Sequence, residues 1–185
     1  MVLTHQFLFV WFMNFFSIFY GYFLVSTFKD FGLKHIKSDN FLTAVGACAS
    51  VFGGMRWVWS YFVDRSTYKR VYGILLITQT VLSLTISFTN SNEFLYFVWV
   101  CASLFCEGGH FTLLPAVSRK IFGRRASDIL GLFLIFPGMA SILSSVLVAY
   151  FLKELHYTFF YFLGGGFTML AGLLLFFFEE KKLFD

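Results

Sequence analysis

Arg56 and Glu107 carry the formal charges that lie inside the long apolar runs of this sequence. His110 follows Glu107 by three positions, which places both side chains on one face of a helix, and Asn14 lies in the first apolar run. A charge inside a membrane is costly, so it normally faces a bundle interior or a water-filled cavity and finds a partner. A guanidinium is a planar, permanently charged donor for a carboxylate. We therefore expect Arg56 to bind a small anionic ligand, with Glu107, His110 and Asn14 around it.

Two alternatives stay open for these residues. Arg56 and Glu107 could instead form a structural ion pair that locks two helices together, and Asn14 could serve interhelical hydrogen bonding or anchoring at the membrane interface. We expect no metal and no cofactor, because one E-x-x-H pair lacks the further carboxylates of a di-metal site and the three cysteines have no ligand spacing. An integral membrane enzyme is disfavoured, since no pairing of a nucleophile with a base is visible.

The elements that hold these side chains follow from composition. Of the 185 residues, 58% are hydrophobic and 13% are charged, whereas soluble domains carry about 25% charged residues. Runs of about 18 or more apolar residues are long enough to cross a bilayer as helices. We predict an all-α integral membrane protein with one six-helix transmembrane domain over residues 1–185. The expected spans are 3–27, 41–63, 71–88, 94–117, 129–152 and 158–178.

Basic residues indicate the orientation of these spans. The side that carries the N-terminus, the links 64–70 and 118–128 and the tail holds nine lysines and arginines, against four on the other side. The positive-inside tendency then predicts that both termini face the cytoplasm or its topological equivalent. The basic residues sit at helix ends and form no extended patch, so we expect the lipid bilayer as a partner and no nucleic acid. A plasma membrane and an organellar membrane, such as the mitochondrial inner membrane, both fit this pattern.

Small residues predict which helices pack closely. Without a hydrophobic drive between helices in lipid, close contacts need small residues on one face. The second, fourth and fifth predicted helices supply them and are expected to face protein; the packing residues are Gly46, Ser50, Gly54, Gly108, Gly131 and Gly138. The third and sixth helices are richer in Ile, Leu and Phe and are expected at the lipid-facing periphery.

Two segments resemble a known family. The stretch GGMRWVWSYFVDRSTYKR, residues 53–70, is similar to the link between the second and third, or eighth and ninth, helices of major facilitator superfamily transporters. The resemblance implies that Asp64, Arg65, Lys69 and Arg70 form a latch at the cytoplasmic gate. A solvated basic turn that serves topology alone is the alternative.

Residues 107–141 narrow this resemblance. The segment EGGHFTLLPAVSRKIFGRRASDILGLFLIFPGMAS is similar to the tenth-to-eleventh helix region of the oxalate:formate antiporter and monocarboxylate transporter branch. The chain then looks like the C-terminal six-helix half of such a transporter, and Arg56 matches the arginine that engages the anionic substrate. It departs from the family at two positions: Pro137 occupies the place of a lysine of the oxalate antiporters, and Phe52 that of an aspartate of the proton-coupled carriers.

The resemblance implies a function and a missing partner. We expect secondary transport of a small monocarboxylate or dicarboxylate by alternating access, with a proton as a candidate coupling ion. Alternating access rocks one six-helix half against another, so a second half is expected as a partner. It could come from a copy of this chain, from a separate chain, or from a longer protein of which this sequence is one piece. The alternative is a transporter-derived subunit that no longer transports and is retained in a larger membrane protein complex.

Overall fold

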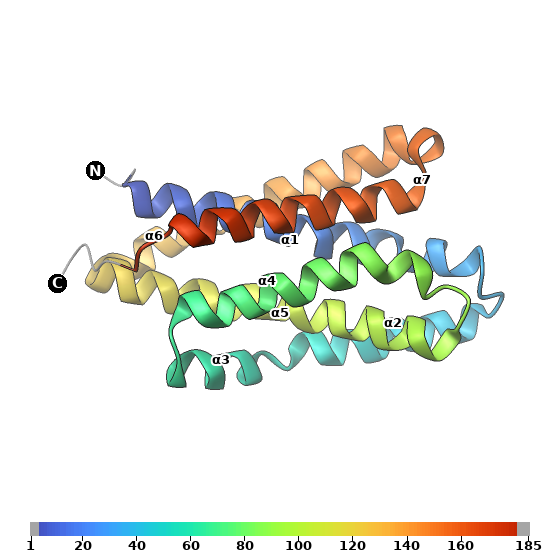
Figure 1. Ribbon diagram of the computed structural model, residues 1–185, viewed down its shortest axis with the longest axis horizontal. Helices are drawn as coiled ribbons and strands as arrows, with labels where there is room; N and C mark the ends of the chain where they lie inside the picture. The colour runs from blue at the N-terminus through green and yellow to red at the C-terminus, as the bar shows by residue number, and fades with distance from the viewer. Residues whose placement is uncertain (1–3, 181–185) are drawn as a thin grey trace.

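The computed structural model describes residues 4–180, and this part of the chain is built from helices. In chain order they are α1 (His5–Leu33), α2 (Asp39–Gly54), α3 (Arg56–Arg65), α4 (Tyr68–Thr85), η1 (Ile86–Phe88), α5 (Glu93–Phe122), η2 (Gly123–Arg125), α6 (Ala126–Phe133) and α7 (Ile135–Phe177). The helices lie side by side along one long axis, and the start of α1 and the end of α7 lie at the same end of the bundle (Figure 1).

Polar side chains in the links begin four of the long helices. Thr4, Ser38, Thr67 and Asn92 precede α1, α2, α4 and α5, and each accepts a hydrogen bond from the backbone N–H three residues further along the chain. Such side chains satisfy one of the donors that a helix N-terminus leaves unpaired. The links therefore start each helix at the point where the apolar run begins.

Five helical stretches are long and apolar enough to cross a membrane: His5–Leu33, Asp39–Arg65, Tyr68–Phe88, Glu93–Leu152 and Glu154–Phe177. The prediction of an all-helical, multi-pass membrane protein is confirmed. The fourth and fifth predicted helices fall within the 60 residues of Glu93–Leu152. There the chain turns back at Gly123, which has a φ of 52°, and α7 turns again at His156, with a φ of 59° (Figure 1).

The helices over the second and fifth predicted spans, 41–63 and 129–152, are each interrupted once. The second breaks at Met55, whose ψ of 42° separates α2 from α3; Gly53 and Gly54 precede the break, and glycines are a common site of sharp helix kinks. The fifth breaks at Leu134, between α6 and α7. Pro137 follows three residues later, and its ring and missing N–H disfavour a regular helix at the carbonyl of Phe133.

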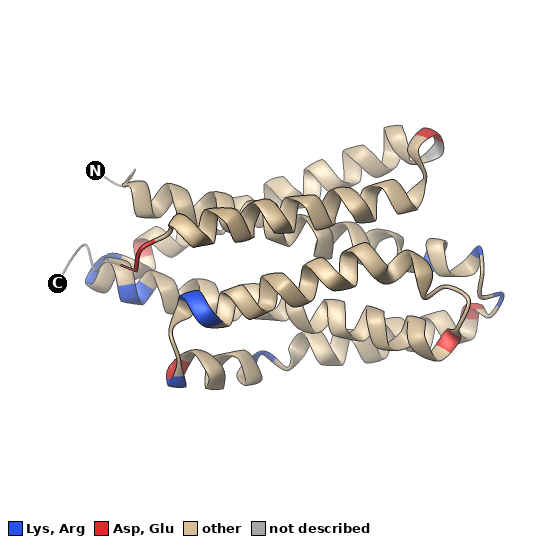
Figure 2. Ribbon diagram, viewed as in Figure 1, with Lys and Arg blue, Asp and Glu red and all other residues tan. Residues whose placement is uncertain are grey.

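Burial is uneven across the bundle. In the most apolar window of α1, 56% of the residues are buried, against 17% in the stretch Asp39–Arg65 that holds α2 and α3. The second predicted helix, one of the three expected to face protein, thus has the least buried window of these stretches. Charged residues gather at the two ends of the bundle, and the middle is largely uncharged (Figure 2), as a membrane-spanning bundle requires.

Candidate functional site

Arg56 is the first residue of α3 and its side chain is exposed. The guanidinium carbon lies 5.0 Å from the centroid of the Phe111 ring, and the hydroxyl of Thr112 donates to the Arg56 carbonyl at 3.3 Å. Both contacts come from α5, so α5 positions the break between α2 and α3. A guanidinium over a ring face gains a cation–π attraction and keeps its N–H groups free at the edge.

Arg56 does not form an ion pair with Glu107. Within residues 4–180, the ion pairs join Lys29 to Asp39 at 3.0 Å and Lys120 to Glu180. Arg56 and Glu107 are close enough for their charges to interact. The direct contact expected of a structural lock between their helices is therefore not made.

The Glu107 side chain points at α1. A Cβ added to Gly21 would overlap the Glu107 carboxyl group, so the glycine leaves the space that this carboxyl occupies. The Oε2 atom of Glu107 is buried and has no hydrogen-bond partner, and the half-buried Tyr22 lies within electrostatic range. A buried acceptor without a donor is costly. Glu107 can therefore still accept a hydrogen bond or bind a proton.

The start of α3 adds a second positive feature beside Arg56. No side chain caps the first turn of α3, since Met55 occupies the N-cap position. The first N–H groups of a helix are unpaired and carry partial positive charge. Broken transmembrane helices use such ends to bind anionic groups of a substrate. Arg56 and the end of α3 together suit an anion at the middle of the bundle.

His110 and Asn14 lie elsewhere, in the buried interior between α1, α4 and α5. The His110 Nδ1 is 3.1 Å from the Cys106 carbonyl and its Nε2 is 2.8 Å from the Ser17 hydroxyl. The Asn14 amide donates to the Val10 carbonyl of its own helix at 2.8 Å. Both side chains are about fully buried. The four residues predicted around one ligand therefore do not share one environment: Arg56 is exposed, the Glu107 carboxyl is packed against α1, and His110 and Asn14 form a buried pair.

The buried pair belongs to a polar cluster that the sequence analysis missed. Ser17 also lies 2.8 Å from the Tyr72 hydroxyl, and Gln79 donates to the Ser17 carbonyl. Their signal in the sequence was polar side chains inside apolar runs. It was overlooked in α4 because that helix was expected at the lipid-facing periphery.

The predicted gate residues lie at the end of the bundle where α3 meets α4. Asp64 borders a cavity of about 330 Å³ between α3, α4 and α5, which Ser60, Thr112 and Arg119 also line. The guanidinium carbon of Arg65 lies 4.1 Å from the ring centroid of Tyr61. Neither side chain of this pair makes an ion pair among the described residues.

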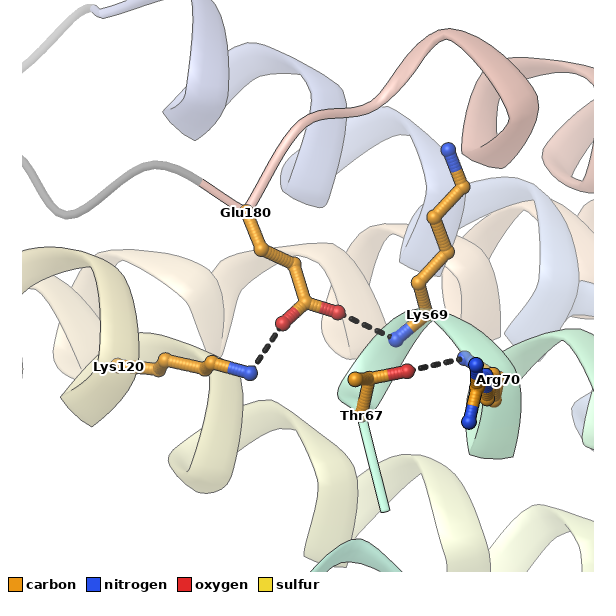
Figure 3. Close-up of polar contacts among 5 residues, drawn as sticks. All are labelled: Thr67, Lys69, Arg70, Lys120 and Glu180. Atoms are coloured by element: carbon orange, nitrogen blue, oxygen red, sulfur yellow. Dashed lines mark hydrogen bonds and ion pairs between the residues drawn. The ribbon is translucent and has the colours of Figure 1, made fainter.

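A polar contact between helix ends is nevertheless present, although its acidic residue is Glu180 and not the predicted Asp64. We call this contact the clasp. The backbone N–H of Lys69 donates to Glu180 Oε1 at 2.6 Å, and Lys120 at the end of α5 forms an ion pair with Glu180 Oε2 (Figure 3). The Lys69 ammonium group donates to the carbonyls of Phe176 and Phe178 at 2.8 and 3.0 Å, where a cation suits the negative end of α7. Figure 3 also shows Arg70, whose backbone N–H donates to the Thr67 hydroxyl at 3.4 Å. This clasp joins the start of α4 to the ends of α5 and α7.

The predicted packing residues fall into two groups. Gly108 meets the backbone of Gly53, since an added Cβ would overlap the Gly53 carbonyl oxygen, and Gly46 meets the ring of Phe28. Ser50 is exposed and donates to the carbonyl of Gly46 within its own helix, at 2.9 Å. A Cβ at any of the other three would meet no atom within 4 Å: Gly54, Gly131 and Gly138. Among residues 4–180, these three glycines do not pack closely against another helix.

The fold and site define an all-helical, multi-pass membrane protein with an arginine and a carboxyl group inside its apolar body. The family model of the Major Facilitator Superfamily matches residues 7–183. The chain belongs to this superfamily, whose members are typically transporters, and the match supports a function of the membrane transporter type. The comparison with curated proteins gave no match.

Proposed function

We propose that this protein is one half of a secondary transporter that moves a small organic anion, a monocarboxylate or a dicarboxylate, by alternating access. One observation carries the proposal: Arg56 is exposed and lacks an ion-pair partner within the described residues, in the middle of an apolar stretch. A carboxylate could accept two N–H bonds from this guanidinium. The uncapped N-terminus of α3 lies beside Arg56 and, like the guanidinium, favours a negatively charged ligand.

We also propose that Glu107 takes up a proton when an anionic substrate binds to Arg56. It interacts electrostatically with Arg56, and Tyr22 is within its range. A bound carboxylate would compete with Glu107 for the positive charge of Arg56, so Glu107 is better accommodated in the protonated form while the anion is bound. This gives a physical reason for a proton as the coupling ion.

The proposal includes six crossings with both ends on the cytoplasmic side, and a second six-helix half that closes the binding space. Supporting this, α2 and α3 are the least buried stretch, and Gly54 in α2 and Gly138 in α7 have open space at the Cβ position. Small residues on an uncovered face permit the close approach of another helix. A second copy of this chain or a separate chain would supply that half.

Uptake by purified protein, with any chain that copurifies, in proteoliposomes tests the anion site. The substrates are radiolabelled small mono- and dicarboxylates. Loss of a hydrogen bond between charged groups costs about 1.5–3 kcal/mol, so Arg56→Lys should lower uptake by about 10- to 100-fold. Arg124→Lys is the control, because Arg124 is an exposed arginine in the η2 turn, far along the chain from the α3 break. Equal uptake by both variants would refute the role of Arg56.

Thiol labelling separates transport from a purely structural role. In a Cys48→Ser background, Ser50→Cys should react with a water-soluble reagent and be protected by substrate, because Ser50 is on the exposed side of α2. Ile77→Cys on the exposed apolar side of α4 serves as the lipid-facing control and should not react. Complete protection of Ser50→Cys without substrate, together with copurification in a many-subunit complex, would favour the non-transporting subunit.

A further inference from the structure

A buried chain of hydrogen bonds links three helices away from the Arg56 site. Tyr72 of α4 lies 2.8 Å from the Ser17 hydroxyl of α1, and Ser17 lies 2.8 Å from Nε2 of His110 in α5. The relative exposure of Tyr72 and Ser17 is 0%, and that of His110 is 1%. From these residues we propose a proton-binding site at His110, with the Ser17 hydroxyl as its movable partner.

One set of hydrogen-bond directions satisfies the contacts of neutral His110 on both ring nitrogens. The Cys106 carbonyl, 3.1 Å from Nδ1, can only accept, so Nδ1 carries the hydrogen. Nε2 then has a lone pair and accepts from the Ser17 hydroxyl. Because Ser17 has one hydrogen to donate, its oxygen accepts from Tyr72. In the neutral site, Tyr72 thus donates to Ser17, and Ser17 donates to Nε2 of His110.

The same atoms also accommodate a protonated His110. A proton taken from water adds to Nε2, and the resulting N–H donates to Ser17 Oγ. The Ser17 hydrogen then turns to the Asn14 carbonyl, which is 3.2 Å away. Ser17 Oγ still accepts from Tyr72 through its second lone pair. Within the cluster, the two protonation states therefore differ by a hydroxyl rotation, with the heavy atoms in place.

Acceptor oxygens around the chain offset the cost of a buried positive charge. Asn14 Oδ1, Gln79 Oε1 and Glu107 Oε2 are buried acceptors outside hydrogen-bond geometry, and the buried Tyr68 hydroxyl, which interacts with the Asn14 side chain, is a donor in the same position. Gln79 reaches the cluster by donating to the Ser17 carbonyl, and Glu107 is one helical turn before His110. A buried charge is tolerated where polar groups of opposite sign surround it. With Tyr68 assigned to Asn14, the acceptors of Gln79 and Glu107 are left over, and spare acceptors suit an added proton.

The neighbouring titratable groups are few. The helix α4 contributes Tyr72 and Tyr68, whose rings stack with centroids 5.2 Å apart. The helix α5 contributes Cys106 and Glu107, and Arg56 of α3 acts on Glu107 from further away. The helix α1 contributes Ser17 and Asn14, which do not titrate, and Tyr22, which lies within electrostatic range of Glu107. The helix α7 contributes Thr168, which does not titrate and lies 3.4 Å from Gln79.

Nitrogen NMR of the His110 ring in lipid nanodiscs tests this site directly and does not depend on transport. The exposed His5 and His35 are replaced by Gln, and His156 by Asn because asparagine tolerates its positive φ. Over roughly pH 8 to 4, His110 should pass reversibly from the neutral form with hydrogen on Nδ1 to the doubly protonated form while the protein stays folded. A ring that stays neutral throughout would overturn the proposal.

Matched variants test whether the hydrogen bonds of Ser17 and Tyr72 control protonation of His110. In Ser17→Ala and Tyr72→Phe the midpoint of the His110 transition should move by at least about half a pH unit, the effect of one ordinary hydrogen bond. Tyr20→Phe is the control, since its hydroxyl joins α1 to α5 through Ser103 at 2.9 Å without touching His110. Equal midpoints in all three variants would refute the role of Ser17. A midpoint that depends on sodium, with choline as the replacement, would reassign the site to a metal cation.

Discussion

Replacement of Gly108 by alanine tests the contact that holds α2 against α5. The added Cβ would overlap the Gly53 carbonyl oxygen and lie 3.1 Å from its carbonyl carbon and 3.4 Å from its Cα. Ordinary carbon contacts lie at about 3.5–4.0 Å, so the helices must separate by roughly half an ångström or more. Backbone atoms cannot turn aside as a side chain does. Overpacking of this kind costs about 1–3 kcal/mol.

The loss should appear as a lower melting temperature. For a chain of this length, 1 kcal/mol corresponds to about 2–4 °C, so Gly108→Ala should melt about 2–12 °C below the parent. The buried Cys101 and Cys106 report unfolding when a fluorogenic thiol reagent reaches them, in a Cys48→Ser background. Gly54→Ala is the matched control, because its Cβ meets open space and alanine favours a helix. If both variants melt alike, α2 does not approach α5 at Gly108.

Two further predictions follow from exposure and charge. In the native protein, Cys48 should react with a small thiol reagent before unfolding while Cys101 and Cys106 react only on unfolding, since Cys48 alone of these three is exposed; simultaneous reaction would contradict this packing. Glu180→Gln should remove the ion pair with Lys120 and weaken the bond to Lys69, which lowers stability by about 1 kcal/mol or less. The deficit should shrink in high salt, because salt screens exposed charges; a deficit independent of salt would point to another cause.

The helical content could be predicted from the sequence because apolar length is a strong signal. The links that separate the predicted spans are polar, and Ser38, Thr67 and Asn92 within them begin helices. The breaks could not be placed, although their signals were present. A glycine pair before Met55 and a proline after Leu134 permit a kink without requiring one, and Pro115 lies inside α5, which continues to Phe122.

Part of the candidate site could also be predicted. Glu107 and His110 do share a face of α5, and both point at α1: Glu107 at Gly21 and His110 at Ser17. Their separate roles could not be foreseen, because the depth of each side chain depends on the small residue opposite it. Ser17, Tyr72 and Glu180 carry no motif of their own. They matter through partners that lie 55 to 111 residues away in the chain.

The substitution Arg56→Leu distinguishes two roles of this arginine, a structural ion pair with Glu107 and a binding site for an anion. The two roles predict opposite changes in stability. If Arg56 and Glu107 locked their helices as a buried ion pair, removal of one partner would cost about 3–5 kcal/mol. The structure instead leaves Arg56 exposed and in no ion pair with Glu107. Arg56 also precedes Asp64 at the polar end of α3 by about 12 Å at 1.5 Å per residue, so it cannot easily reach the interface. A leucine there removes from an apolar span a charge that makes no ion pair among the described residues. We therefore expect Arg56→Leu to melt at or above the melting temperature of the parent protein and to lose uptake of carboxylates. Functional sites commonly show such a trade-off, in which a substitution that raises stability lowers activity. A fall of the size expected for a broken buried pair would mean that Arg56 serves the fold and not a substrate.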